Sequence, residues 1–302
     1  MTQVGLGLDP TAVAAGAAGL GPWLDRVAAA GLDHVVVGDH VSFRGAGSDG
    51  LLMATAVAML QPRLDVHVGV YLLALRHPVP VARQLATAAG LAPGRLSLGI
   101  GVGGEDRHEI EICGIDPATR GRRTDESIAA LRGLLTGCPT TLHGHEVSFT
   151  DAVVAPAPAH PIPMLVGGRS DAAVRRAGRL GDGWLPIWVS PERYRRGVAD
   201  VVEIAESHDR EAPTGHGLQV WCAFDETPEV ARAVLAGAME DFYGLPFERF
   251  ERYSPTGSAE RVAAFLEPYV EAGCTHVNLL ARGLDAEAVL AGASEVRRLL
   301  AS

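Results

Sequence analysis

Short apolar runs alternate with helical patterns along the whole chain. Eight of these runs are candidates for strands. They cover residues 4–8, 34–37, 64–72, 96–100, 164–166, 183–186, 218–224 and 275–281. Helices are predicted at residues 22–30, 51–60, 79–91, 122–135, 171–180, 191–207, 228–241, 259–272 and 285–301. Strands that are each followed by a helix, with no low-complexity linker, predict an α/β fold: a single (β/α)8 TIM barrel over residues 1–302.

Two connections are longer than a barrel requires. Residues 101–121 follow the fourth strand, and residues 137–162, which are rich in Pro and Gly, precede the fifth. Long insertions in barrels often build the lids of active sites. We therefore expect insertions after strand 4 and before strand 5.

The helix at residues 51–60 has almost no polar face. A helix in the outer ring of a barrel normally carries one. An exposed apolar surface of this kind marks a contact with another protein, so we expect a homodimer that associates through this helix.

Composition narrows the function. The 302 residues are 47% hydrophobic and carry a net charge of −10, which argues against nucleic-acid binding and against binding to an anionic membrane surface. The four cysteines are far apart and form no Cys-x-x-Cys pair. With no signal-peptide pattern and no apolar run of about 20 residues, we expect a cytoplasmic protein without membrane spans.

A strand, a glycine turn and a helix start follow one another between Pro163 and Trp184. An apolar run ends at Gly167-Gly168, and Ser170 or Asp171 can cap the following helix. The first amide groups of a helix lack partners, so a phosphate can bind there, close to backbone without Cβ atoms. Arg169 adds a positive charge. The alternative is a plain turn with its arginine in solvent.

Polar side chains follow the first two strands. Asp39-His40 comes directly after the second strand, where a histidine can exchange a proton and a neighbouring carboxylate can orient it. Asp9 ends the first strand and belongs to the same rim, although Asp-Pro also starts an ordinary turn. A turn cap at Asp39 with a structural His40 remains the alternative.

The fourth strand leads into a glycine-rich segment with formal Gly-x-Gly-x-x-Gly spacing, Gly99 to Gly104. A dinucleotide fold would pass straight into a long helix, whereas the helical pattern here is short and stops at Gly114. We expect Gly101, Val102 and Gly103 to lie flat against a planar ligand instead. His143-Gly-His145 has metal-ligand spacing but lies in an insertion, so we predict no metal site.

Taken together, these motifs resemble the bacterial luciferase-like monooxygenase superfamily over nearly the whole chain. They are Asp39-His40, Arg76-His77-Pro78, the run from Gly94 to Gly103, Glu126 within residues 122–135, Gly167-Gly168-Arg169 leading to Gly181-Asp182-Gly183-Trp184, and Gly257 to Val262. The resemblance implies a dimeric barrel that binds reduced FMN or the deazaflavin F420 at the carboxyl ends of its strands. It also implies a non-prolyl cis peptide near Tyr71 to Ala74, which places Tyr71, Leu72 and Arg76 beside the cofactor.

The Asp-His pair looks closer to the F420-using branch. In that branch the matching histidine assists hydride transfer, which implies a catalytic role for His40 with Asp39 as its orienting partner. Arg44, Arg76 and Arg169 are candidate cations for the acidic tail of F420. Phe43 stands where some of these enzymes carry tryptophan.

Several functions therefore stay open at this stage. The leading one is F420-dependent hydride transfer with a small organic substrate. The second is an FMN-dependent monooxygenase that uses O2 and a partner flavin reductase. A flavin-binding barrel without turnover and a metal-dependent hydrolase are further alternatives.

Overall fold

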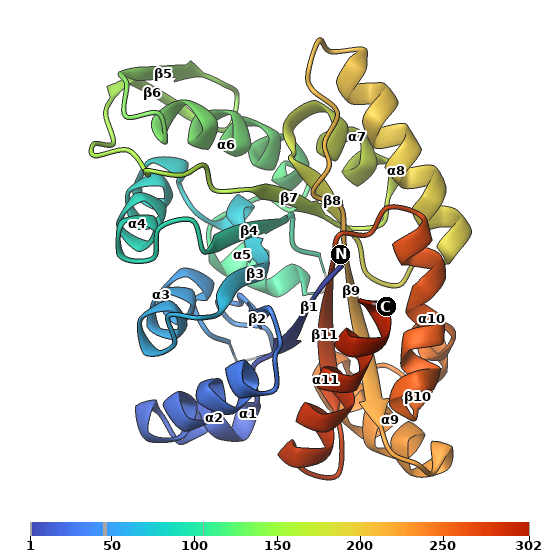
Figure 1. The fold of residues 1–302 in the computed structure, drawn as a ribbon. Helices are drawn as coiled ribbons and strands as arrows, with labels where there is room; N and C mark the ends of the chain where they lie inside the picture. The colour runs from blue at the N-terminus through green and yellow to red at the C-terminus, as the bar shows by residue number, and fades with distance from the viewer. Residues whose placement is uncertain (1, 45–46, 105, 302) are drawn as a thin grey trace.

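A parallel nine-stranded sheet forms the centre of the computed structural model, which describes residues 2–44, 47–104 and 106–301. The strand order is β10-β9-β11-β1-β2-β3-β4-β7-β8, and every neighbouring pair is parallel. The strands are β1 (Gln3–Gly7), β2 (His34–Val37), β3 (Asp65–Leu72), β4 (Leu96–Gly101), β7 (Met164–Gly167), β8 (Gly183–Leu185), β9 (Gly217–Phe224), β10 (Thr256–Gly257) and β11 (His276–Arg282). Figure 1 shows the sheet at the centre of the molecule.

The segment after the edge strand β8 pairs with β9. An isolated parallel bridge pairs Ile187 with Gln219, and the backbone N–H of Gln219 donates to the carbonyl of Pro186 at 3.0 Å. Eight strands thus follow one another around the structure, and β10 is a short addition beside β9. The arrangement is the α/β barrel that the sequence predicts.

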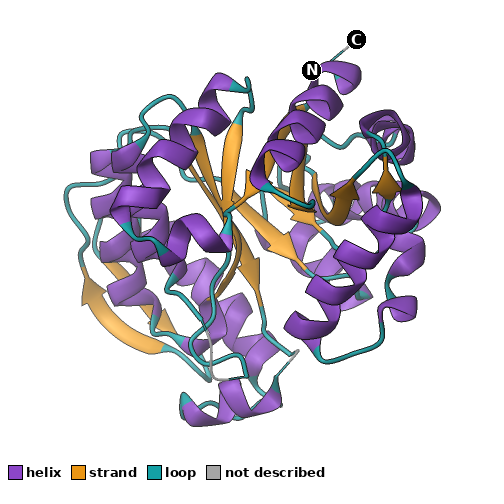
Figure 2. Cartoon of the chain, turned by 90° about the horizontal axis from the view of Figure 1, so that it is seen from below, coloured by secondary structure: helices purple, strands orange, loops and turns teal. Residues whose placement is uncertain are grey.

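Helices surround the strands, as Figure 2 shows. They are α1 (Pro10–Ala14), α2 (Ala17–Ala29), α3 (Gly50–Leu60), α4 (Pro78–Leu91), α5 (Arg107–Ile112), α6 (Arg120–Leu134), α7 (Asp171–Leu180), α8 (Pro191–Glu206), α9 (Pro228–Tyr243), α10 (Ala259–Glu271) and α11 (Ala286–Leu300). Several begin at side-chain caps, among them the Ser170 cap that the sequence predicts. Asp49 accepts hydrogen bonds from two amide groups of α3, and Ser170 caps α7.

All eight predicted strands are present, with ends that differ by one residue at most. Each predicted helix is present too, although α2 begins five residues earlier than expected. The hairpin β5 (Thr140–His143) and β6 (Ser148–Ala152) was not predicted. The Glu126 carboxylate of α6 holds the turn of this hairpin. It accepts hydrogen bonds from the backbone N–H groups of His145, Glu146 and Val147.

A cluster of histidines fills the interior near the starting ends of the strands. The rings of His34 and His67 stack 3.8 Å apart, and His276 meets His67 edge-on at 5.1 Å. His34 Nε2 pairs with Asn278 Oδ1 at 2.8 Å. Burial lowers the pKa of His34 to about 4 and that of His276 to about 3, so both rings are neutral at neutral pH.

The face of α3 that points away from the barrel is apolar. The side chains of Leu52 and Met59 are 71% and 56% exposed, while Leu51 and Val57 are buried against the barrel. The structure thus leaves uncovered the surface for which the sequence predicts a partner. In the described ranges, no helix combines the length and apolar character needed to cross a membrane.

Candidate active site

A cavity of about 580 Å³ opens at the carboxyl ends of the barrel strands. Its lining comes from β1, β2, β3, β4, β7, β8, β9 and β11, mostly near their carboxyl ends, from the segments after β2 and β8, and from α1, α3 and α9. Catalytic residues of α/β barrels lie at this end. Of the residues that the sequence singles out, those lining the cavity are Asp39, His40, Leu72, Gly101, Val102, Gly103, Gly167 and Gly168.

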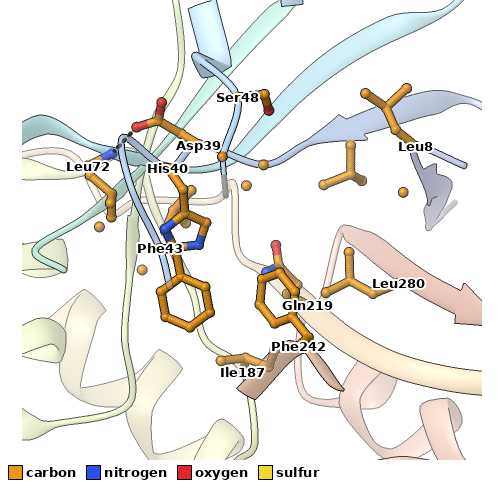
Figure 3. A pocket seen from close by; sticks show the side chains of 18 of the residues that line it. Leu8, Asp39, His40, Phe43, Ser48, Leu72, Ile187, Gln219, Phe242 and Leu280 are labelled. Atoms are coloured by element: carbon orange, nitrogen blue, oxygen red, sulfur yellow. Dashed lines mark hydrogen bonds between the residues drawn. The ribbon is translucent and has the colours of Figure 1, made fainter. Parts of the chain in front are cut away.

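The Asp39 carboxylate lies in the cavity wall and accepts several hydrogen bonds. It accepts hydrogen bonds from the amides of Gly50 (2.9 Å) and Leu72 (2.8 Å), the latter drawn in Figure 3. The guanidinium of Arg76 binds both carboxylate oxygens, at 2.7 and 2.8 Å. The expectation that Asp39 orients His40 is therefore wrong, because its oxygens are engaged by Arg76 and by the backbone.

Arg76 is held by its ion pair with Asp39. Burial alone would lower its pKa, but the adjacent Asp39 carboxylate raises it, so the guanidinium stays charged. The guanidinium also lies 4.4 Å from the centre of the Tyr71 ring, and neither residue lines the cavity. The Tyr71 and Arg76 side chains thus pack against each other, and their expected contact with the cofactor stays a prediction.

His40 has a different carboxylate partner, which the sequence reasoning missed. Its Nδ1 lies 3.1 Å from Oε2 of Glu109, whose other oxygen accepts the amides of Val41 (2.7 Å) and Ser42 (2.9 Å). Glu109 is only 3% exposed although it lies in a segment rich in charged residues. A signal in the sequence could have pointed to Glu109. It lies in the short helix α5, which Asp106 caps.

The geometry fixes the tautomer of the neutral imidazole. An ionised carboxylate can only accept, so Nδ1 of His40 carries the proton toward Glu109, and Nε2 remains as an acceptor. No described side chain or backbone group hydrogen-bonds to Nε2. The ring stacks on Phe43 at 4.5 Å, and Figure 3 shows both residues beside the cavity.

Glycines form the wall built by β3, β4 and β7. Gly69, Gly101, Gly103, Gly167 and Gly168 all line the cavity. Because they carry no side chains, a flat ligand can approach the backbone closely. The non-prolyl cis peptide lies in this wall and joins Gly69 to Val70. It was expected slightly later in the chain, near Tyr71 to Ala74.

The predicted phosphate turn lies at the edge of this wall. Gly167 and Gly168 line the cavity, whereas Arg169 and Ser170 do not. The Ser170 hydroxyl accepts from Ala173 N at 3.2 Å, and Trp184 Nε1 donates to the Gly168 carbonyl at 2.7 Å. The turn is thus held from both sides. Gly168 has φ of 96°, so any side chain there would strain the fold as well as the site.

Asp9 does not reach the cavity. Its side chain accepts from Ala12 N at 2.8 Å and caps α1, and it lines a separate cavity of about 520 Å³ between α2 and the start of α11. The carboxylate is used by the helix that follows, and the cofactor contact expected at Asp9 stays a prediction. Within the described residues, no group of three or more His, Cys, Asp or Glu side chains could hold a metal ion.

Known proteins share sequence similarity with this chain. A protein of Mycobacterium tuberculosis is 36% identical over 162 residues, 54% of this chain and 56% of its own length, so the match spans little more than half of that relative. An F420-dependent glucose-6-phosphate dehydrogenase of Amycolatopsis mediterranei is 28% identical over 301 residues, covering 89% of this chain and 90% of that protein.

Solved structures share the fold over almost the whole chain. An F420-dependent secondary alcohol dehydrogenase, solved with an F420-acetone adduct, superposes with a TM-score of 0.85 at 19% identity and covers 99% of both chains. The oxygenating constituent of 3,6-diketocamphane monooxygenase from Pseudomonas putida, solved with FMN, gives 0.77 at 16% identity and covers 100% of this chain and 98% of its own. The family model for luciferase-like monooxygenases matches residues 4–295. The chain therefore belongs to the luciferase-like monooxygenase family.

Proposed function

We propose that this protein is an F420-dependent oxidoreductase that transfers a hydride between the cofactor and a small organic substrate. The observation that carries the proposal is the His40 imidazole, held through Nδ1 by buried Glu109 beside a wall of glycines. A proton acceptor fixed next to a flat binding surface suits hydride transfer at an alcohol or carbonyl carbon. The similarity to F420-dependent glucose-6-phosphate dehydrogenases supports the choice of cofactor.

The cavity fits a planar group with hydrogen-bonding edges. Its glycine wall leaves room for such a ring system. Two polar atoms at its lining, Trp188 Nε1 and Gln219 Oε1, are buried and have no hydrogen-bond partner among the described residues. Buried polar atoms are normally paired, so these two are available to a ligand.

Each of the site residues then has a defined role in the reaction. Glu109 fixes the tautomer and orientation of His40, and Nε2 of His40 takes up or returns the hydroxyl proton of the substrate. Asp39 and Arg76 stiffen the loop that carries His40. The turn at Gly167, Gly168, Arg169 and Ser170 receives the cofactor phosphate at the start of α7. When bound, F420 supplies the two-electron hydride chemistry.

The setting of the reaction is part of the proposal. All four cysteines are free thiols, which supports a reducing, cytoplasmic location. A separate F420 reductase or a second F420-dependent enzyme would recycle the cofactor. The apolar face of α3 supports a homodimer.

A fluorescence titration of the purified protein with F420 and FMN in parallel tests this function. We expect F420 to bind with micromolar or tighter affinity. Binding of FMN alone would instead assign an O2-dependent monooxygenase served by a flavin reductase, and binding of neither would remove both functions. Turnover that is unchanged in His40→Ala would leave a flavin-binding barrel in which this residue catalyses nothing.

Gly38 offers a variant that separates the site from the fold. Gly38 lines the cavity, and a Cβ built there meets no atom within 4 Å. Gly38→Val should therefore weaken ligand binding about tenfold or more by occupying the cavity, with little change in unfolding free energy. Gly90→Val, at a position in α4 that is equally open but remote from the cavity, is the matched control.

A further inference from the structure

The two sides of the cavity differ in chemistry. The wall of β3, β4 and β7 presents mainly glycines. The opposite side, built by β9, β11, the segment after β8 and α9, presents large side chains, which are Ile187, Trp188, Trp221, Phe242, Tyr243 and Leu280. Figure 3 shows Ile187, Phe242 and Leu280 across the cavity from Leu72. A flat cofactor on the glycine side leaves the aromatic side to select the substrate.

Aromatic rings continue from this side up to His40. Phe242 of α9 lies 5.1 Å from Phe43 and 6.1 Å from His40, measured between ring centres. It also lies 5.9 Å from Trp221. Phe242 is 39% exposed, whereas Phe43 is buried. Phe242 therefore stands at the mouth and forms an apolar chamber with Phe43 and Trp221 next to the proton acceptor.

Charge in this chamber is scarce. Asp39 is neutralised by Arg76, and the described lining holds one other permanently charged side chain, Arg282. The Arg282 guanidinium lies 4.7 Å over the Trp221 ring and donates from Nη1 to the Ala281 carbonyl at 2.8 Å. The sequence contains no lysine. A phosphate ester with nearly two negative charges would lose its hydration here with a single cation to replace it.

We propose that the substrate is a neutral alcohol, or the corresponding ketone, with an apolar ring that lies against Phe43, Phe242 and Trp221. This inference rests on the proposed F420-dependent function. In the oxidation, the C–H bond of the carbinol carbon breaks and its electron pair leaves as a hydride to F420. The O–H proton passes to Nε2 of His40, and a C=O bond forms. The reduction runs through the same steps in reverse.

Three probes of graded charge test the substrate class. They are 1-phenylethanol, its 4-carboxylate analogue 4-(1-hydroxyethyl)benzoate, and glucose 6-phosphate, each assayed by the loss of F420 absorbance after F420 binding has been measured separately. We expect kcat/KM to be at least tenfold higher for 1-phenylethanol than for the carboxylate, and no turnover of glucose 6-phosphate.

Each of the other results of these assays would refute one part of the proposal. Preference for the carboxylate would make Arg282 an anion anchor and refute a neutral substrate. Turnover of glucose 6-phosphate would refute the apolar class, and so would F420 binding without turnover of 1-phenylethanol or its ketone. Failure of F420 to bind would refute the proposed function itself, which keeps the two failures distinguishable.

Phe242 supplies the matching variants. Phe242→Ala should raise KM for 1-phenylethanol about tenfold and leave the F420 dissociation constant within about twofold, because the ring faces the substrate side. Phe242→Leu should recover most of the loss. Phe149→Ala, in the β5–β6 hairpin away from the cavity, is the control. An unchanged KM in Phe242→Ala would remove this ring from substrate recognition.

Discussion

The Glu109 carboxylate binds Nδ1 of His40 at 3.1 Å, although 69 residues separate the two in the chain. Glu109 reaches it from the short helix α5 in the insertion after β4, while His40 follows β2. The same carboxylate accepts the amides of Val41 and Ser42, so it fixes the loop as well as the ring. The insertion therefore completes the site by supplying the partner of the histidine.

Glu109→Gln should lower kcat by about a hundredfold, because the neutral amide can still bind the loop amides but no longer enforces the tautomer of His40. Binding of F420 should change little. Glu111→Gln, on the exposed side of the same helix, should leave kcat unchanged. Steady-state kinetics with both variants decide the point, and equal kcat values for Glu109→Gln and the parent protein would contradict it.

Asp39→Asn should destabilise the fold by about 3–5 kcal/mol, because it leaves the partly buried Arg76 without its counter-charge. Urea unfolding measures this change. Replacing both partners, as Asp39→Asn with Arg76→Met, should restore part of the loss. Asp171→Asn is the control, since its ion pair with Arg193 is largely exposed on the Asp171 side and should matter by less than about 1 kcal/mol. A loss no larger than the control's would refute a structural role for the buried pair.

Stability should fall as the pH drops from about 6.5 toward about 4. Burial lowers the pKa of His34 from 6.5 to about 4, so in this range the unfolded chain binds a proton that the folded protein excludes. His276, with its pKa lowered to about 3, acts in the same sense. Once the pH is below its folded-state pKa, each of these histidines lowers the free energy of unfolding by about 3 to 5 kcal/mol.

Urea midpoints measured between about pH 7 and pH 5 check this prediction. The midpoint should move steadily to lower urea as the pH falls. His145→Asn, which alters an exposed histidine of the hairpin turn, should show the same slope as the parent protein. A midpoint that stays constant over this range would contradict the neutral, buried state of the cluster.

The protein should be a homodimer in light scattering at micromolar concentration. Leu52→Glu with Met59→Glu places charges on the apolar face of α3 and should give a monomer with an unchanged circular dichroism spectrum. Leu284→Glu is the control, because Leu284 is 67% exposed but belongs to the loop before α11. A parent protein that is monomeric, or a dimer that survives the double substitution, would refute association through this face.

The sequence by itself determined the eight barrel strands, the helices between them and their order. Apolar runs such as residues 34–37 predict buried strands because they are rich in Val and too short for a helix. Caps such as Ser170 and turns such as Gly167-Gly168 were visible because they depend on neighbours within four residues. The positions of Asp39, His40 and the glycines at the strand ends followed from the barrel alone.

Tertiary structure decided which side chains meet. Asp39 and His40 are adjacent in sequence, yet one binds Arg76 and the other Glu109. Asp9 looked equivalent to them but bonds to its own helix. Such pairings depend on how far each strand carries its terminal residues and on which loop folds back over them. Local patterns do not contain that information, because it arises only when distant segments pack together.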